Sequence, residues 1–237
     1  MTAGRAFRSD LLKLKGKGLW LLAAAGPVGL IAMQALNYGL RFDYMQKRYA
    51  GNAWGGLLDN IAVFVPIALL MGITILCSLL ANIEHHTSAW KQLLALPVPR
   101  TAVFAAKFAV AVMLLAVSCA LLSLGAAALG FIFGFGAGDM PGAEIAKLGL
   151  YPFLASMPIL ALLLWLCMTF RNQAVPITIG VVMAVLSIFG MSEWLPVNWP
   201  LFAYTAPQRE WFLGAGVIGG AAVLALGALH FNRKDVN

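Results

Sequence analysis

The chain has 237 residues, of which 62% are hydrophobic and only 11% are charged. Soluble domains carry about 25% charged residues, and a fold of this size could not hide so much apolar surface from water. The composition therefore excludes a water-soluble enzyme. Sixteen Lys and Arg residues against nine Asp and Glu residues give a net charge of +7. Contact with anionic lipid accounts for this excess, so we expect a lipid membrane and no nucleic acid as a partner.

Six uncharged runs are each long enough to cross a bilayer as a helix, which takes about 20 apolar residues. They are residues 18–40, 61–83, 108–138, 148–170, 172–192 and 211–232. A β-barrel would show alternating segments of about ten residues instead of continuous runs. Because the runs use about half of the chain, there is no room for a separate soluble domain. We therefore expect an all-α, polytopic membrane protein whose residues 1–237 form a single transmembrane domain.

The distribution of basic residues sets the orientation. Cytoplasmic loops carry an excess of Lys and Arg, and a cytoplasmic N-terminus places eleven of the sixteen basic residues on the inner side. These are Arg5, Arg8, Lys13, Lys15, Lys17, Lys91, Arg100, Lys107, Arg171, Arg233 and Lys234. The outer side then holds Arg41, Lys47, Arg48, Lys147 and Arg209. We expect both termini in the cytoplasm and the chain in the inner membrane of a bacterium.

Glycine and proline shape the predicted spans. As a straight helix, residues 108–138 would extend about 46 Å, against a hydrocarbon core of about 30 Å, so we expect this helix to end or bend near Gly134. The GxxxG spacings at Gly130–Gly134 and Gly216–Gly220 favour close packing within the chain over dimerisation. Kinks are compatible with the prolines of four runs, which are Pro27, Pro66, Pro158 and Pro176.

No catalytic or metal-binding motif stands out. The sequence has no GxxxxGK[ST] phosphate loop, and Glu84-His85-His86 lacks the spacing that puts two imidazoles on one helix face. The spans lack the mid-membrane charges typical of ion-driven carriers, which indicates that energy enters from another subunit. We expect no catalytic residue, metal or cofactor in this chain. The three cysteines, inside the runs, are interpreted as apolar filler.

Two segments on the outer side are aromatic. Residues 41–60 are predicted to be an exposed connection with interfacial aromatic residues. Residues 193–210 are too apolar for a free loop and too interrupted for a span, so we expect a partly re-entrant or interface-lying hairpin. Its aromatic side chains either anchor it at the membrane surface or form an outer gate that contacts substrate. The candidate gate residues are Trp194, Trp199, Phe202 and Tyr204.

The basic segment 5–17, before the first span, is amphipathic. Phe7, Leu11 and Leu14 fall on one helical face, and basic residues surround this face. The pattern fits an N-terminal elbow helix on the inner membrane surface, and equally an ordinary positively charged flank.

The loop of residues 84–100, between the second and third spans, also predicts a short amphipathic helix. Trp90, Leu93 and Leu94 share one face, and Pro97 and Pro99 end the helix because neither continues its hydrogen bonds. This apolar face needs cover, which either the membrane or the groove of a partner protein supplies.

These features, in this order, resemble the ABC-2 type permeases, the membrane subunits of ATP-driven exporters. The sequence is similar to the lantibiotic-immunity and bacitracin-type export permeases within that group. Residues 8–15 resemble the elbow of the family, and residues 90–100 followed by Lys107 resemble its coupling helix. Six spans and a broken outer hairpin also match. The family usually has Ser or a similar residue between the proline and the arginine, where this sequence has Val98-Pro99.

The resemblance implies a permease that is not itself an enzyme and exports an amphipathic peptide, lipid or drug-like molecule by alternating access, for example in antimicrobial peptide immunity. ATP and Mg²⁺ bind to separate cytoplasmic ABC ATPase subunits, and a second copy or a related permease completes a dimer. The implied ATPase-docking residues are Glu84, Trp90, Lys91, Leu93, Leu94, Pro97 and Arg100. The competing hypotheses are a stand-alone membrane carrier, a membrane sensor or accessory protein, and an intramembrane enzyme.

Overall fold

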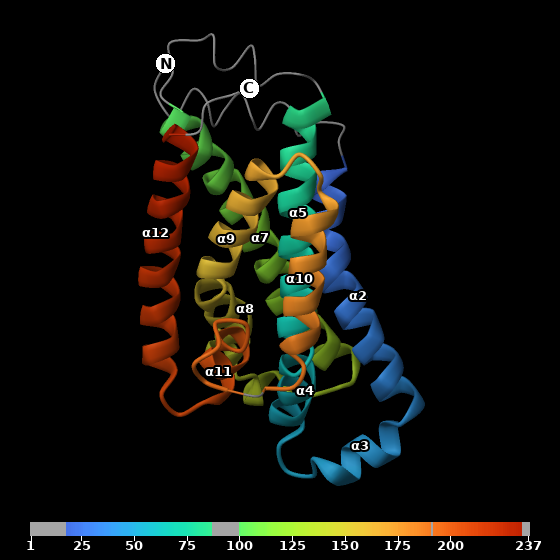
Figure 1. Cartoon of the computed structure of the whole chain (residues 1–237). Coiled ribbons are helices and arrows are strands. Elements are labelled where there is room, and N and C mark those ends of the chain that lie inside the picture. The colour runs from blue at the N-terminus through green and yellow to red at the C-terminus, as the bar shows by residue number, and fades with distance from the viewer. Residues whose placement is uncertain (1–17, 87–99, 191, 234–237) are drawn as a thin grey trace.

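The computed structural model describes residues 18–86, 100–190 and 192–233, and every regular element in these ranges is helical (Figure 1). This confirms the prediction of an all-α protein. The elements are α2 (Leu19–Leu40), α3 (Phe42–Arg48), α4 (Ala53–Ala62), α5 (Val65–His86), α7 (Arg100–Ile132), the 3₁₀ turn η1 (Ala137–Asp139), α8 (Gly142–Ala155), α9 (Met157–Thr169), α10 (Ala174–Leu186), α11 (Trp199–Thr205) and α12 (Arg209–Arg233).

The helices confirm a multi-pass membrane protein. Four are long and apolar enough to cross a bilayer, namely Leu19–Leu40, Val65–Ile83, Thr101–Ile132 and Arg209–His230. Helices α8 and α9 make a fifth candidate span when taken together across a bend of 46°. Helix α10 is apolar but has only 13 residues, about 20 Å of helix against a core of about 30 Å. The count of six crossings therefore stays a prediction.

The bundle has two ends. We call the end at which α2 begins and α12 ends the terminal end (Figure 1). Helix α5 ends there, α7 begins there, and the turn between α9 and α10 lies there. Helices α3 and α4 mark the opposite end. Arg171 lies in the turn between α9 and α10. The predicted outer cations lie at the junction of α2 and α3, on α3, on α8 and at the start of α12. Of the predicted inner cations, the described residues include Arg100, Lys107, Arg171 and Arg233, which belong to elements at the terminal end; the other seven lie outside the described residues, and the orientation stays a prediction.

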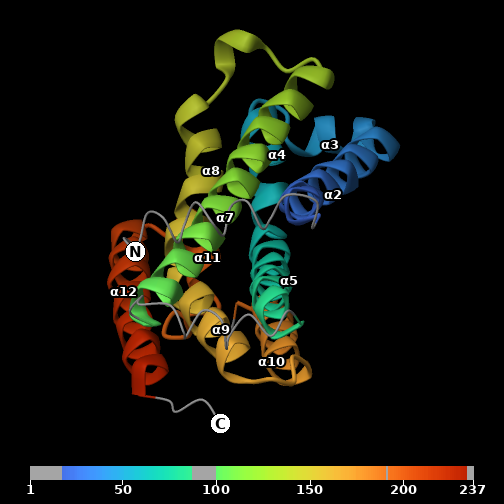
Figure 2. The same ribbon diagram turned by 90° about the horizontal axis from the view of Figure 1, so that it is seen from above.

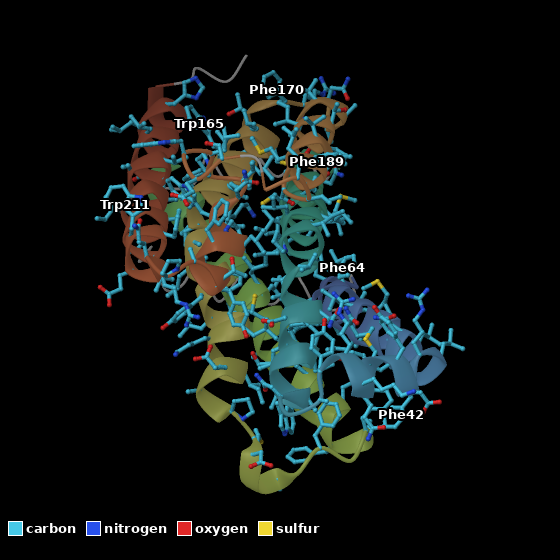
Figure 3. All side chains as sticks on the ribbon, turned by 90° about the horizontal axis from the view of Figure 1, so that it is seen from below. Phe42, Phe64, Trp165, Phe170, Phe189 and Trp211 are labelled. Atoms are coloured by element: carbon cyan, nitrogen blue, oxygen red, sulfur yellow. The ribbon has the colours of Figure 1, made fainter. Side chains whose placement is uncertain are left out.

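Two main clusters of buried apolar side chains hold the helices together. One lies toward the terminal end and includes Leu80, Phe104 and Leu164. The other lies toward the opposite end and includes Trp54 and Leu148. Other large apolar side chains point away from the bundle, among them Phe189 (66% exposed) and Trp211 (64% exposed) (Figure 3). An outward apolar surface is what a lipid-facing helix bundle requires.

The prediction that residues 41–60 form an exposed connection holds for most of residues 41–53 and is wrong for residues 54–60, most of which are buried or half-buried. The segment folds into α3 and α4, and the Asn52 side chain caps α4 by accepting a hydrogen bond from the backbone N–H of Gly55 at 2.9 Å. The buried residues Trp54, Leu57 and Ile61 follow helical spacing. Their shared apolar face draws α4 into the bundle.

Helix α7 differs from its predicted run at one end and agrees at the other. It ends at Ile132, and Gly134 has a φ of +77°, a left-handed conformation that favours glycine. The expected end near Gly134 is therefore confirmed. The helix begins at Arg100, before the predicted start at residue 108, and this brings Lys107 into the span with 3% exposure. The span therefore carries one buried basic residue near its terminal end, where the sequence analysis placed none.

Three of the four prolines lie in the first turn of a helix, and one of them, Pro158, directly follows the 46° bend between α8 and α9. Pro66 is the second residue of α5, Pro158 the second of α9, and Pro176 the third of α10. Proline in the first turn of a helix removes no intrahelical hydrogen bond. Among the four, Pro27 is the one inside a helix, α2. The predicted fourth span is accordingly broken at Ser156, between α8 and α9.

Candidate functional site

The helices that carry the predicted ATPase-docking loop reach the terminal end of the bundle (Figure 1). Residues 87–99 lie outside the described residues, and so do the predicted elbow of residues 5–17 and the docking residues Trp90, Lys91, Leu93, Leu94 and Pro97. Glu84 belongs to the last turn of α5 and Arg100 opens α7, but the described side chains do not include theirs. The docking assignment stays a prediction.

The two ends of that loop are attached to different sides of the bundle. Helix α5 packs against α10, whereas α7 begins beside α12 (Figures 1 and 2). A Cβ built on Gly227 of α12 would lie 3.1 Å from the ring of Phe104, in the second turn of α7. Residues 87–99 therefore connect a helix of the α10 side to a helix of the α12 side.

Helices α9 and α12 are joined near the terminal end by two side chains that are far apart in sequence. The indole N–H of Trp165 donates to Nδ1 of His230 at 3.1 Å, and the rings lie 5.5 Å apart at 60°. Figure 3 shows Trp165 near the end of this helix pair. The sequence offered no local pattern for this contact, because 65 residues separate the partners.

The segment of residues 193–210, for which an outer location is predicted, contains α11, which packs on α8 and α12. Trp194 is 86% exposed, whereas Tyr204 is 6% exposed and belongs to the cluster around Trp54. Phe202 stacks on Phe212 of α12 with 5.6 Å between ring centroids, and the Trp199 indole donates to the carbonyl of Glu193 at 2.9 Å. The four candidate gate residues are thus distributed among different surroundings, and the gate stays a prediction.

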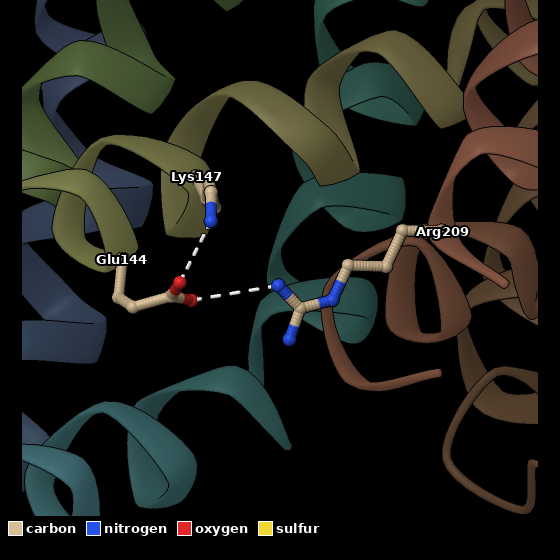
Figure 4. Close-up of polar contacts among 3 residues, drawn as sticks. All are labelled: Glu144, Lys147 and Arg209. Atoms are coloured by element: carbon tan, nitrogen blue, oxygen red, sulfur yellow. Dashed lines mark hydrogen bonds and ion pairs between the residues drawn. The ribbon is translucent and has the colours of Figure 1, made fainter. Parts of the chain in front are cut away.

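A carboxylate links α8 to α12 beside this segment (Figure 4). One oxygen of Glu144 lies 2.7 Å from Nζ of Lys147, and the other lies 3.6 Å from the guanidinium of Arg209. Burial, and secondly the charge of Glu144, raise the pKa of Tyr204 to about 12, so its phenol stays protonated at neutral pH. The sequence placed Lys147 and Arg209 on the same side but did not reveal their shared partner.

An aromatic cluster fixes α4 against α7. The Trp54 ring meets Phe131 and Phe135 edge-on, each at 5.6 Å, an arrangement that aromatic pairs favour. Its indole N–H donates to the carbonyl of Gly136 at 3.1 Å. A Cβ on Gly130 would overlap the same indole, so this glycine packs within the chain, as the sequence predicted.

Both glycines of the second GxxxG pair pack within the chain, whereas in the first pair a Cβ on Gly134 would meet nothing within 4 Å. A Cβ on Gly216 would lie 2.6 Å from Cα of Ala155, and one on Gly220 would lie 2.6 Å from Cβ of Met157. These two contacts flank the break between α8 and α9. The glycines of α12 therefore let it approach the broken span closely.

A cavity of about 290 Å³ lies between α2, α5 and α7. None of its lining residues is charged, and Ser118 carries their one hydroxyl group. No group of three or more His, Cys, Asp or Glu side chains in the described part of the chain is arranged to hold a metal ion. The cavity is therefore suited to an apolar occupant.

Comparison with known families gives one match. A family model described as "ABC-2 family transporter protein" matches residues 6–187, which are 182 of the 237 residues. The match runs from the predicted elbow to the end of α10, and α11 and α12 follow it. Neither the curated proteins nor the solved structures returned a match.

Proposed function

The chain belongs to the ABC-2 transporter family as its membrane permease subunit, and from this premise we propose that it serves an ATP-driven exporter in a bacterial inner membrane, with both termini cytoplasmic. The observation that carries the proposal is the family match, which spans both the elbow and the coupling loop. The terminal end of the bundle would be cytoplasmic, in keeping with the positive-inside rule. Residues 1–237 would form one transmembrane domain.

Energy would enter through the loop of residues 84–100. ATP and Mg²⁺ would bind to separate ABC ATPase subunits, and the loop would dock on them. The apolar residues Trp90, Leu93 and Leu94 would fill a groove on the ATPase surface, as an amphipathic helix does in other helix-in-groove contacts. The charges of Glu84, Lys91 and Arg100 would set the register of this contact, with Pro97 ending the docked helix.

The attachment of the loop supports a role in moving the helices. Residues 87–99 join α5, which packs on α10, α9 and α2, to α7, which packs on α2, α8 and α12. A displacement of the loop would therefore act on helices from both sides of the bundle. With a second permease, either a copy or a relative, this movement would open a shared path alternately to each side of the membrane. The uncharged surfaces favour an amphipathic peptide, a lipid or a drug-like substrate.

The test is purification of the full chain from native membranes in mild detergent, comparing wild type with the double variant Trp90→Ala/Leu94→Ala. We expect an ATPase to copurify with wild type and to be lost from the double variant. Trp194→Ala is the matched control, because this exposed tryptophan lies outside the loop. ATPase retention unchanged in the double variant would overturn the docking assignment, and transport by the chain alone would favour a stand-alone carrier.

A further inference from the structure

The cavity between α2, α5 and α7 has no part in the docking described above. It lies where the two main apolar clusters meet, since its lining takes Leu114 from one cluster and Leu30 and Leu122 from the other. An apolar cavity of about 150 Å³ in a soluble protein is large enough to hold benzene. At about 290 Å³, this one has room for a longer hydrocarbon.

The lining restricts the chemistry of an occupant. Apart from the Ser118 hydroxyl and the Cys119 thiol, the lining side chains offer no polar hydrogen-bonding group. A charged or amide-containing ligand would lose its hydrogen bonds there, at a high cost in free energy. All three lining helices are candidate membrane spans, so the surroundings are hydrocarbon. An unbranched acyl chain fits these conditions.

Two glycines, which have no side chain, leave the cavity open toward the outside of the bundle. Gly26 of α2 and Gly72 of α5 both line it, and a Cβ built on either glycine meets no atom within 4 Å. Gly26, Ala25 and Ile75 are exposed, whereas Leu30 and Leu114 at the back are buried. Figure 2 shows α2 at the edge of the bundle beside α5 and α7. The opening between α2 and α5 therefore faces the side where bilayer lipid would lie.

We propose that this cavity binds one acyl chain of a bilayer phospholipid, inserted between α2 and α5. If the cavity were empty, the side chains that line it would lack dispersion contacts on one side. A hydrocarbon chain from the surrounding bilayer can supply these contacts. The headgroup would stay outside, because the cavity has no charged side chain to receive it. This site is separate from the ATPase contact, and its occupancy does not depend on transport.

The experiment uses the full-length chain in nanodiscs of phosphatidylethanolamine and phosphatidylglycerol. A trace of phosphatidylethanolamine with a diazirine in one acyl chain is photolysed, and the labelled peptides are located by mass spectrometry. We expect adducts on the cavity faces of α2 and α5. Gly26→Leu/Gly72→Leu should reduce these adducts about tenfold, since displacing even two methylene groups from an apolar site has an effect of that size.

Gly29→Leu is the matched control. Gly29 is on α2 but does not line the cavity, and a Cβ at this position also meets nothing within 4 Å. Labelling of the Gly29→Leu variant should equal that of wild type. If the double variant fails to fold, Ala25→Leu narrows the opening at an exposed position and should also reduce labelling. Adducts spread along α2 and unchanged by cavity filling would mean annular lipid only and overturn the proposal. In a second measurement a photoreactive residue replaces Ala25 at the opening. A crosslink from it to a second copy would also overturn the proposal, because that copy would then cover the opening.

Discussion

The two sides of the bundle use glycine in opposite ways. On the α12 side, Gly216 and Gly220 stand at GxxxG spacing and bring their helix into contact with the α8–α9 break. On the α2 side, Gly26 and Gly72 have no neighbour where their Cβ would be, and a cavity remains between the helices. Small residues in a membrane helix thus permit close packing only where a second helix occupies the space they leave.

This difference contrasts two places in the molecule, the close contact of α12 with the α8–α9 break and the open space beside the first half of α2. Helix α12 is held by glycine contacts, by the Trp165–His230 hydrogen bond and by the Arg209–Glu144 pair. The first half of helix α2, from Leu22 to Leu30, borders the cavity. Helix α7, which follows the loop of residues 87–99, packs on both α2 and α12. We expect the position of α2 and the occupancy of the cavity beside it to change while α12 stays packed on α8 and α9.

The largest effect should come from crowding the contact of α12 with the α8–α9 break. Gly216→Leu places a side chain against the backbone of Ala155 and Leu154, so we expect destabilisation of about 3 kcal/mol, seen as a lower thermal midpoint in detergent. Gly214→Leu is the control, because a Cβ at Gly214 in the same helix meets nothing within 4 Å. Equal midpoints for the two variants would contradict the close approach of α12.

A smaller effect is expected from enlarging the cavity. Leu114 is fully buried and lines the cavity, and Leu114→Ala should cost about 2 kcal/mol, at the low end for a buried leucine. The loss should be smaller in nanodiscs than in detergent, because an acyl chain can follow into the added space. Denaturation in both media measures this difference. An equal or larger loss in nanodiscs would speak against a hydrocarbon occupant.

Filling the cavity should have little effect on folding, or stabilise it. Gly72→Leu adds a side chain into open space and replaces a poor helix former by a good one, a gain of about 0.5–1 kcal/mol. The thermal midpoint should equal or exceed that of wild type. A clear decrease would show that the space around Gly72 is already filled.

The smallest effect concerns the ion pairs of Glu144. Glu144→Gln removes the charge that faces Lys147 and Arg209. The three side chains are partly exposed, so we expect a loss of about 0.5 kcal/mol that disappears at high salt. Thermal midpoints at low and high salt measure it. A larger loss that persists at high salt would mean that this pair, and not the glycine contacts, holds α12 to α8.

Local patterns in the sequence predicted the parts of the fold that depend on them. Uninterrupted hydropathy gave the position of α2, and the excess length of the third run predicted that α7 ends near Gly134, where the structure has a left-handed glycine. Contacts between distant residues were not predictable in this way. Trp54 donates to a carbonyl 82 residues away, and without that contact its segment resembles an exposed loop.

The docking assignment rests on local evidence in the sequence and stays a prediction. The docking residues of the loop came from amphipathic spacing and family resemblance, both local properties of the sequence. The cavity could not be predicted, because it needs Gly26, Gly72 and Leu114 from three helices to lie around one space. Each of these residues by itself is an ordinary residue of a membrane helix.

The central claim is that this permease works with a separate ATPase. Native mass spectrometry of the full chain, extracted from its own membranes in mild detergent, tests this claim most directly. The account predicts a complex that contains ATPase subunits with a Walker phosphate-binding loop, together with this permease and a second permease chain. A protein that is released alone, or with a kinase in place of the ATPase, would contradict it.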